Sequence, residues 1–129
     1  MKLNFILIIL ALFLVSCNKD ESEAELLGTW KLVATLADPG DGSGVFMPVT
    51  SDQTISFNAD GTVRSNQSLC DFFDNNAEST SGTYSAEDMY FTTSDCGIED
   101  FKYQFEIEGQ FLTYFVVCIE ACGVRYRKI

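Results

Sequence analysis

The chain has 129 residues, 19 of them acidic and 8 basic, which gives a formal net charge of −11. A protein this acidic lacks the basic surface that nucleic-acid phosphates require, so nucleic acid is excluded as a partner. The sequence has no histidine, which excludes the Ser-His-Asp and Cys-His catalytic arrangements. With 47% apolar residues the chain is too hydrophobic for a disordered acidic tail, and its length suits one small domain.

The N-terminal segment differs in composition from the rest of the chain. A basic start is followed by an unbroken apolar run over residues 5–15. This run is too short for a membrane-spanning helix, which needs about 20 residues, but it suits the core of a signal peptide. The residues from Leu14 to Cys17 resemble a lipobox, which implies removal of residues 1–16 and a diacylglycerol and an N-acyl lipid on Cys17. The alternative is an ordinary secretory signal in which Cys17 is incidental.

The next stretch, residues 17–25, is predicted to be the lipidated cysteine and an acidic tether, because it is polar and has no apolar periodicity. The segment Lys19-Asp20-Glu21 resembles the tag that directs some bacterial lipoproteins to the outer face of the outer membrane; the alternative is a plain hydrophilic spacer. We therefore expect a lipid-anchored protein of the bacterial envelope, in the outer membrane, with a periplasmic or surface-exposed domain. The lipid on Cys17 is the only cofactor-like group expected.

From residue 26 onward, short β-rich runs alternate with turn clusters, and no helical period persists for three turns. The expected strands are about 28–36, 52–58, 62–69, 80–85, 89–93, 101–108, 111–118 and 123–128. In the first strand, alternation puts Trp30, Leu32, Ala34 and Leu36 on one face. Eight strands in next-neighbour order predict an all-β antiparallel up-and-down barrel. The alternative is an immunoglobulin-like sandwich, although Trp30 precedes the cysteines instead of lying between two of them.

Four short motifs occur in the order found in one known family. They are Gly28-Thr29-Trp30, the Phe57 to Thr62 hairpin, the Gly82 to Tyr84 strand and an arginine in the final strand. Together they resemble the lipocalin-like domains of many bacterial lipoproteins over residues 26–129. The resemblance implies an eight-stranded lipocalin-like barrel and suggests a function in binding a small apolar or amphipathic molecule.

Pairing of the first and last strands would bring Trp30 close to Arg127, or to Arg125 on the same face. A guanidinium stacked on an indole stabilises by about 0.5–2 kcal/mol. We expect Gly28, Trp30 and one of these arginines to seal one end of the barrel, the floor; a ligand contact is the alternative. The opposite end is the mouth.

The four cysteines that follow Cys17 all fall in predicted mouth loops. An even number of cysteines in an exported chain indicates disulfides. Three pairings are possible, and we favour Cys70–Cys96 with Cys118–Cys122. A zinc site is the alternative, but no Cys-x-x-Cys pair supports it, and no metal is expected.

Acidic residues crowd the same loops, without lysine or arginine among them. They are Asp38, Asp41, Asp71, Asp74, Glu78, Asp95, Glu99, Asp100 and Glu120. A negative rim would attract cationic ligands or offer oxygen ligands to calcium. Alternatively, these residues only keep the loops soluble.

Apolar residues in the mouth loops and polar residues on the third strand indicate a candidate binding site. Its residues are Phe46, Ser65, Gln67, Phe72 and Phe73. Strict alternation turns Ser65 and Gln67 inward with Val63 and Leu69. The first hypothesis is a small-molecule binding protein; the alternative is a filled barrel that contacts a protein partner in the envelope. The chain is expected to be monomeric and not an enzyme.

Overall fold

The structure is a computed structural model and describes residues 18–70, 78–93 and 96–129. In these residues one helix, α2 (Asn18–Leu26), precedes nine strands. The strands are β1 (Gly28–Ala37), β2 (Met47–Pro48), β3 (Thr54–Phe57), β4 (Thr62–Ser65), β5 (Thr80–Ser85), β6 (Tyr90–Thr93), β7 (Tyr103–Glu108), β8 (Phe111–Val116) and β9 (Cys122–Lys128). All pairings are antiparallel.

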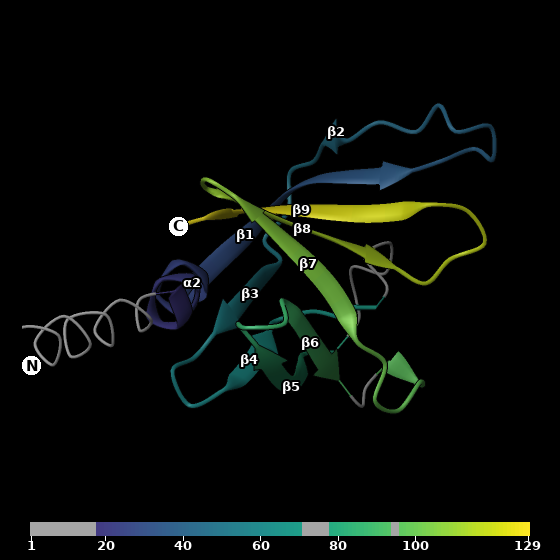
Figure 1. Cartoon of the computed structure of the whole chain (residues 1–129). Coiled ribbons are helices and arrows are strands. Elements are labelled where there is room, and N and C mark those ends of the chain that lie inside the picture. Colours follow the sequence, from purple (N-terminus) through teal and green to yellow (C-terminus); the bar gives the residue numbers. More distant parts are fainter. Residues whose placement is uncertain (1–17, 71–77, 94–95) are drawn as a thin grey trace, which may run out of the picture.

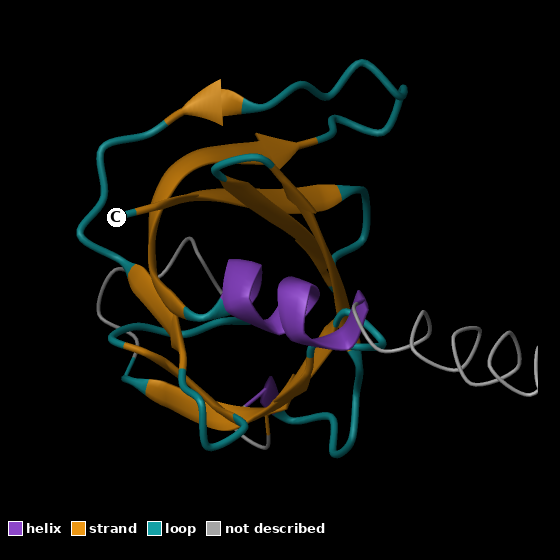
Figure 2. Ribbon diagram, turned by 60° about the vertical axis from the view of Figure 1, so that its left-hand side comes forward, coloured by secondary structure: helices purple, strands orange, loops and turns teal. Residues whose placement is uncertain are grey.

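Eight of these strands form a closed barrel. Strands β3 to β9 pair in sequence order, β1 pairs with β3, and β1 also pairs with β9 from Trp30↔Lys128 to Ala37↔Cys122. Figure 2 shows the strands as a ring. The predicted up-and-down barrel is therefore confirmed, and the sandwich alternative is wrong, because in a sandwich the first and last strands would not close one ring.

Strand β2 was not predicted, and it pairs only with the second half of β1. Its register is Ala34↔Pro48 and Thr35↔Met47. The two-residue strand carries no alternating pattern that a sequence analysis can detect. Its formation depends on β1, which is longer than β3 and leaves the edge of its second half unpaired by β3.

A bulge in β1 moves side chains of its second half to the face of the sheet opposite the predicted one. Leu32 pairs with Tyr126, whereas Ala34 pairs with Arg125, so Val33 is the extra residue. Directly opposed residues share a face, and Ala34 therefore lies on the outer face with Arg125. The expectation that Trp30, Leu32, Ala34 and Leu36 share one face is correct only for the first two.

The core fills the interior of the barrel with aromatic side chains. Fully or almost fully buried rings belong to Trp30, Phe57, Phe91, Tyr103, Phe105, Tyr114 and Tyr126. They contact one another: the ring centroids of Phe91 and Tyr114 are 5.0 Å apart, and those of Tyr114 and Tyr126 are 5.9 Å apart. The alternation predicted for residues 101–108 is confirmed, since Tyr103 and Phe105 are buried between exposed neighbours.

Helix α2 occupies most of the stretch that we predicted to be a tether. The sequence shows no apolar stripe there, but Glu21 falls in the first turn, where negative charge favours the helix dipole. The last residue, Leu26, is completely buried, and its carbonyl accepts a hydrogen bond from Nε1 of Trp30 at 2.9 Å. The helix therefore lies across the floor of the barrel, as Figure 2 shows.

The two ends of the barrel differ in what surrounds them. Figure 1 shows α2 at one end, whereas the β8–β9 connection and the loop from β1 to β2 lie at the opposite end. Ten residues of β1 separate the two ends, a distance of roughly 30 Å for an extended strand. The floor thus faces the N-terminal segment, and the mouth faces away from it.

Candidate functional site

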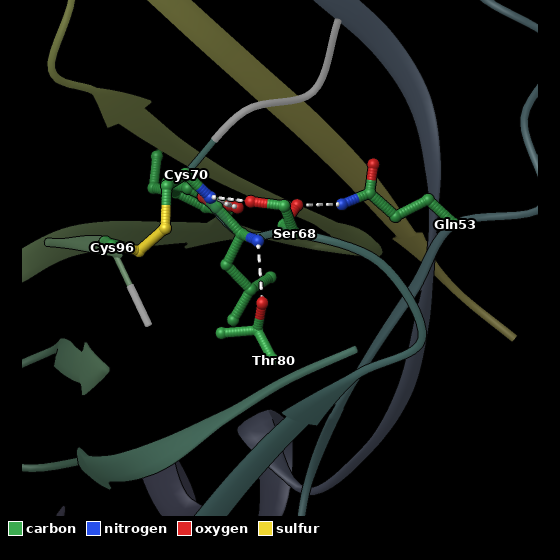
Figure 3. The surroundings of a disulfide bond; sticks show 7 residues. Gln53, Ser68, Cys70, Thr80 and Cys96 are labelled. Atoms are coloured by element: carbon green, nitrogen blue, oxygen red, sulfur yellow. Dashed lines mark hydrogen bonds between the residues drawn. A yellow bond between two sulfur atoms is a disulfide. The ribbon is translucent and has the colours of Figure 1, made fainter. Parts of the chain in front are cut away.

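The segment 66–70 closes the mouth of the barrel from within. Leu69 is 1% exposed and packs in the core cluster. Its backbone N–H donates to Oγ1 of Thr80 at 3.4 Å, and its carbonyl accepts from the Tyr114 hydroxyl at 3.1 Å. Nε2 of the buried Gln53 donates to the Ser68 carbonyl at 2.7 Å (Figure 3). Main-chain polar groups of this closing segment are thus satisfied by side chains from β5, β8 and the chain before β3.

Both favoured disulfides are present, and both lie at the mouth. Cys70 is bonded to Cys96, with 5.5 Å between the Cα atoms (Figure 3). Cys118 is bonded to Cys122, with 6.1 Å between the Cα atoms. The first bond fastens the closing segment to the chain after β6, and the second closes the β8–β9 hairpin. The zinc alternative is therefore wrong for these four cysteines.

Two described members of the predicted binding site, Ser65 and Phe46, lie on opposite faces of the barrel wall. Ser65 is buried, and its hydroxyl oxygen accepts a hydrogen bond from the backbone N–H of Gln67 at 3.3 Å, while Gln67 is half-buried. The Ser65 hydroxyl is thus used at the end of β4, where the chain turns into the closing segment. Phe72 and Phe73 lie outside the described residues, so their placement stays a prediction.

Phe46 lies on the outer surface of the barrel, not in its mouth. Its ring contacts Phe115, with centroids 6.4 Å apart, and the guanidinium carbon of Arg125 is 4.2 Å from its centroid. Both partners alternate with inward-facing residues and therefore point outward. The prediction of Phe46 as a ligand contact at the mouth is wrong, because its ring packs against Phe115 and Arg125 on the outer face.

Gly123 makes room for this outer aromatic pair. A Cβ at position 123 would lie 3.0 Å from a ring carbon of Phe46 and 3.1 Å from a ring carbon of Phe115. Both rings therefore rest on bare backbone of β9. The sequence offers one signal for this arrangement, a glycine inside a strand, which often marks a close approach of another group.

The floor is sealed by a different cation from the one predicted. Nζ of Lys128 lies 5.1 Å from the centroid of the Trp30 ring, whereas Arg127 is exposed and pairs with Lys31. Arg125 lies against Phe46 on the outer face and donates from Nε to Oγ1 of Thr113 at 3.2 Å. The predicted Trp30–arginine contact is wrong because inward-facing positions of β9 are even-numbered.

Gly28 is at the floor, as predicted, and begins β1 with φ of +118°. A side chain there would be strained, and its Cβ would lie 3.5 Å from Cε of Lys128. Lys128 also donates from Nζ to the carbonyl of Glu25, which ties the last strand to α2.

One acidic residue of the predicted rim, Asp38, acts within its own loop. Both carboxylate oxygens of Asp38 accept backbone N–H groups, those of Gly40, Gly42 and Gly44, at 2.7–3.0 Å. These hydrogen bonds, that of Gly44 first, hold the pKa of Asp38 below its usual range. Asp71, Asp74 and Asp95 lie outside the described residues. Among the described residues, no group of three or more His, Cys, Asp or Glu side chains is arranged to hold a metal ion.

Two buried tyrosines, Tyr114 and Tyr126, lie in the core and have raised pKa values. Burial raises the pKa of Tyr114 well above its usual value and also raises that of Tyr126. The Tyr126 hydroxyl has no hydrogen-bond partner among the described residues, although the Tyr114 hydroxyl is near enough to influence its pKa. We take the two hydroxyls to interact electrostatically without hydrogen-bond geometry. Both groups are neutral at physiological pH, and neither is placed to act as a base.

The β8–β9 hairpin carries apolar side chains that the sequence analysis did not single out. Phe115 is 54% exposed, Val117 58% and Ile119 99%. An isoleucine among the three residues between Cys118 and Cys122 is the signal that identifies this feature. Together with Phe46, these residues form what we call the tip patch.

Hollows on the described surface are polar and open to solvent. Three of them have volumes of about 300, 330 and 470 Å³. The largest is lined by Arg64, Ser65, Ser79, Thr80 and Ser81, and none of the three is lined by the buried core rings. Their lining residues are mainly small or polar, and none is a leucine, isoleucine, valine, methionine or phenylalanine that would hold an aliphatic or aromatic ligand.

No family model, curated protein or solved structure matches the chain in comparisons with known proteins. Helix α2, the helix in the described part of the chain, is neither long enough nor apolar enough to cross a membrane. The resemblance to lipocalin-like lipoprotein domains therefore depends on the four sequence motifs, to which the structure adds the closed eight-stranded barrel.

Proposed function

We propose that this protein is a lipid-anchored envelope protein whose lipocalin-like barrel is a filled scaffold for contacts with another protein. The observation that carries the proposal is the position of its apolar surface. Large side chains fill the interior, while Phe115, Val117 and Ile119 are exposed on the outside. Large apolar patches that are exposed on a folded domain commonly mark sites where another molecule binds.

The interior favours this function over small-molecule carriage. Ligand pockets are concave and mostly apolar, and their volume is commonly about 300–1,000 Å³. Here Leu69 is inserted at the mouth and held by Thr80, Tyr114 and the Cys70–Cys96 bond. A ligand would have to displace this segment and the rings beneath it.

The anchor gives the barrel an orientation. The proposed lipid on Cys17 immediately precedes α2, which lies across the floor. The floor would then face the membrane, and the mouth end would face a partner in the periplasm or outside the cell. No catalytic role is proposed.

Two measurements test this function. Native mass spectrometry of the purified mature protein should show protein plus the Cys17 lipid and no other bound molecule. A reproducible additional mass, removed by lipid extraction, would instead support the carrier function. In cell fractionation, the protein should be in the membrane fraction, and Cys17→Ser should leave it unprocessed and without attached lipid; normal lipid attachment in that variant would contradict the anchor.

A further inference from the structure

The hairpin that carries the tip patch is held in place by a disulfide and by a hydrogen bond to a neighbouring loop. The Cys118–Cys122 bond closes the hairpin that carries Val117 and Ile119. The backbone N–H of Asp38 donates to the Ala121 carbonyl at 2.9 Å, which fastens this hairpin to the loop after β1. A surface held in this way loses little conformational entropy when a partner binds.

Carboxylates lie beside the tip patch, in the β8–β9 connection and in the loop after β1 that packs against it. The Glu120 carboxyl lies against the loop after β1, because a Cβ on Gly40 would be 3.2 Å from it. Asp41 is exposed in the same loop. Residues 32–63 and 103–124, which supply the tip, contain no lysine or arginine. The tip therefore combines exposed apolar groups with carboxylates, while the cationic Arg125 lies at its base over Phe46.

The edge of the sheet at this end is poorly suited to pairing with a second copy of the chain. The Val49 N–H donates to the Val33 carbonyl, so alternation directs the Pro48 backbone away from β1, toward the free edge of β2. Proline has no N–H to donate there, and such prolines protect sheet edges from strand addition. Two copies would also bring the same carboxylates together.

A lipid surface is also a poor fit for the tip patch. Anionic headgroups repel carboxylates, and peripheral membrane sites carry lysine and arginine beside their apolar groups. The tip lies at the end of the barrel opposite α2, and hence opposite the proposed anchor (Figure 1).

We infer that the tip patch docks a cationic polypeptide segment of another envelope protein, one that presents apolar side chains flanked by lysine or arginine. The apolar side chains of that segment cover Ile119, Val117 and Phe115, and its cations face Glu120 and Asp41. This inference deepens the proposed function and rests on it.

The test uses the mature lipidated protein in zwitterionic nanodiscs and two fluorescent peptides, one alternating leucine with lysine and one alternating leucine with glutamate. Signal from empty nanodiscs is subtracted. The lysine peptide should bind and the glutamate peptide should not. Ile119→Ser should weaken binding about tenfold, because it removes one apolar contact from the interface. Glu120→Gln should weaken it about threefold at low salt, because it removes one rim charge.

Matched controls carry the same substitutions at the floor end. Ile129→Ser replaces an isoleucine that is 68% exposed, and Glu108→Gln replaces the exposed glutamate at the end of β7. Both should bind as the wild type does. Equal binding by all four variants would overturn the inference, because it would indicate generic attraction to an acidic protein. Equal binding of the glutamate peptide, or a dimer in sedimentation that Ile119→Ser dissolves, would also overturn it.

Failure of this inference is distinguishable from failure of the proposed function. A small molecule found inside the purified barrel would contradict the proposed scaffold function, independently of the peptide binding results. If no small molecule is bound in the barrel and no peptide binding depends on the tip, the scaffold function still holds. Only the inference that the tip patch docks a cationic segment is then wrong.

Discussion

Lys128 places its ammonium group 5.1 Å from the centroid of the Trp30 indole, across the strand pair that closes the barrel. The same indole donates from Nε1 to the carbonyl of Leu26, the last residue of α2. One residue of β1 therefore joins the first strand, the last strand and the helix across the floor.

The first prediction concerns this junction. Trp30→Ala should destabilise the protein by about 3–5 kcal/mol, because it empties the largest fully buried side chain of the core. Denaturant unfolding monitored by circular dichroism measures the loss. Lys128→Met is the control: it keeps an apolar stem and removes only the ammonium contacts, at a cost of about 1 kcal/mol. A Trp30→Ala protein as stable as the wild type would contradict the sealed floor.

The two disulfides should differ in their contributions to stability. Cys70 and Cys96 are 26 residues apart, and Cys118 and Cys122 are 4 apart. A longer closed loop restricts the unfolded chain more, which gives about 3.5 kcal/mol for the first bond and about 2 kcal/mol for the second. Chemical denaturation of the double variants Cys70→Ala/Cys96→Ala and Cys118→Ala/Cys122→Ala should show this order. The reverse order would show that the bonds act mainly through the folded state.

Leu69→Ala should open the mouth. The variant loses a buried side chain beneath the closing segment and should be about 2–5 kcal/mol less stable. It should also bind the apolar dye 8-anilinonaphthalene-1-sulfonate, which the wild type should exclude. Leu36→Ala, at a half-buried position on the outer face, is the control and should not bind the dye. Dye binding by the wild type would mean that the interior is already accessible.

Gly82 should tolerate no side chain. A Cβ at this position in β5 would lie 1.8 Å from the Thr92 carbonyl oxygen of β6, and a backbone atom cannot move aside cheaply. We expect Gly82→Ala to cost about 1–3 kcal/mol or more in thermal or chemical denaturation. At Gly42, φ is +77° and no atom lies within 4 Å of a built Cβ, so Gly42→Ala should cost only about 1 kcal/mol of backbone strain. Equal effects would contradict the close approach of β5 and β6.

The loop after β1 should loosen in acid. Hydrogen bonds from Gly44, Gly40 and Gly42 lower the pKa of Asp38 in the folded protein. A carboxyl whose pKa is lower in the folded state stabilises above the unfolded pKa, and this stabilisation is lost as the pH falls through the folded pKa, below about 4. The NMR signal of the Gly44 amide should therefore titrate with a midpoint below about 4. In Asp38→Asn this titration should disappear; an unchanged midpoint would assign it to another group.

Much of the fold follows from local patterns. The alternation in residues 101–108 and the glycine-containing turns place most strands within two or three residues of their observed bounds. The cysteines also fall at one end by strand counting alone, which is why the favoured pairing is confirmed. Candidate binding residues were predicted less well, because facing inward does not mean lining a cavity. Ser65 faces inward, but its hydroxyl is used by the adjoining Gln67 N–H.

The sequence by itself determined the eight strands of the barrel and their order along the chain, since period-two alternation and turn residues act over a few neighbouring positions. Closure depends on the pairing of β1 with β9, which are far apart in the chain. Only the tertiary structure decided which groups meet across the barrel. One extra residue at Val33 changes the face of Ala34 and Leu36, and the register of β9 places Lys128 beside Trp30 in place of an arginine. The tertiary structure also places Phe46 on the outside, next to Phe115. Register and bulges depend on partners far apart in the chain, and their effect reverses with a shift of a single residue.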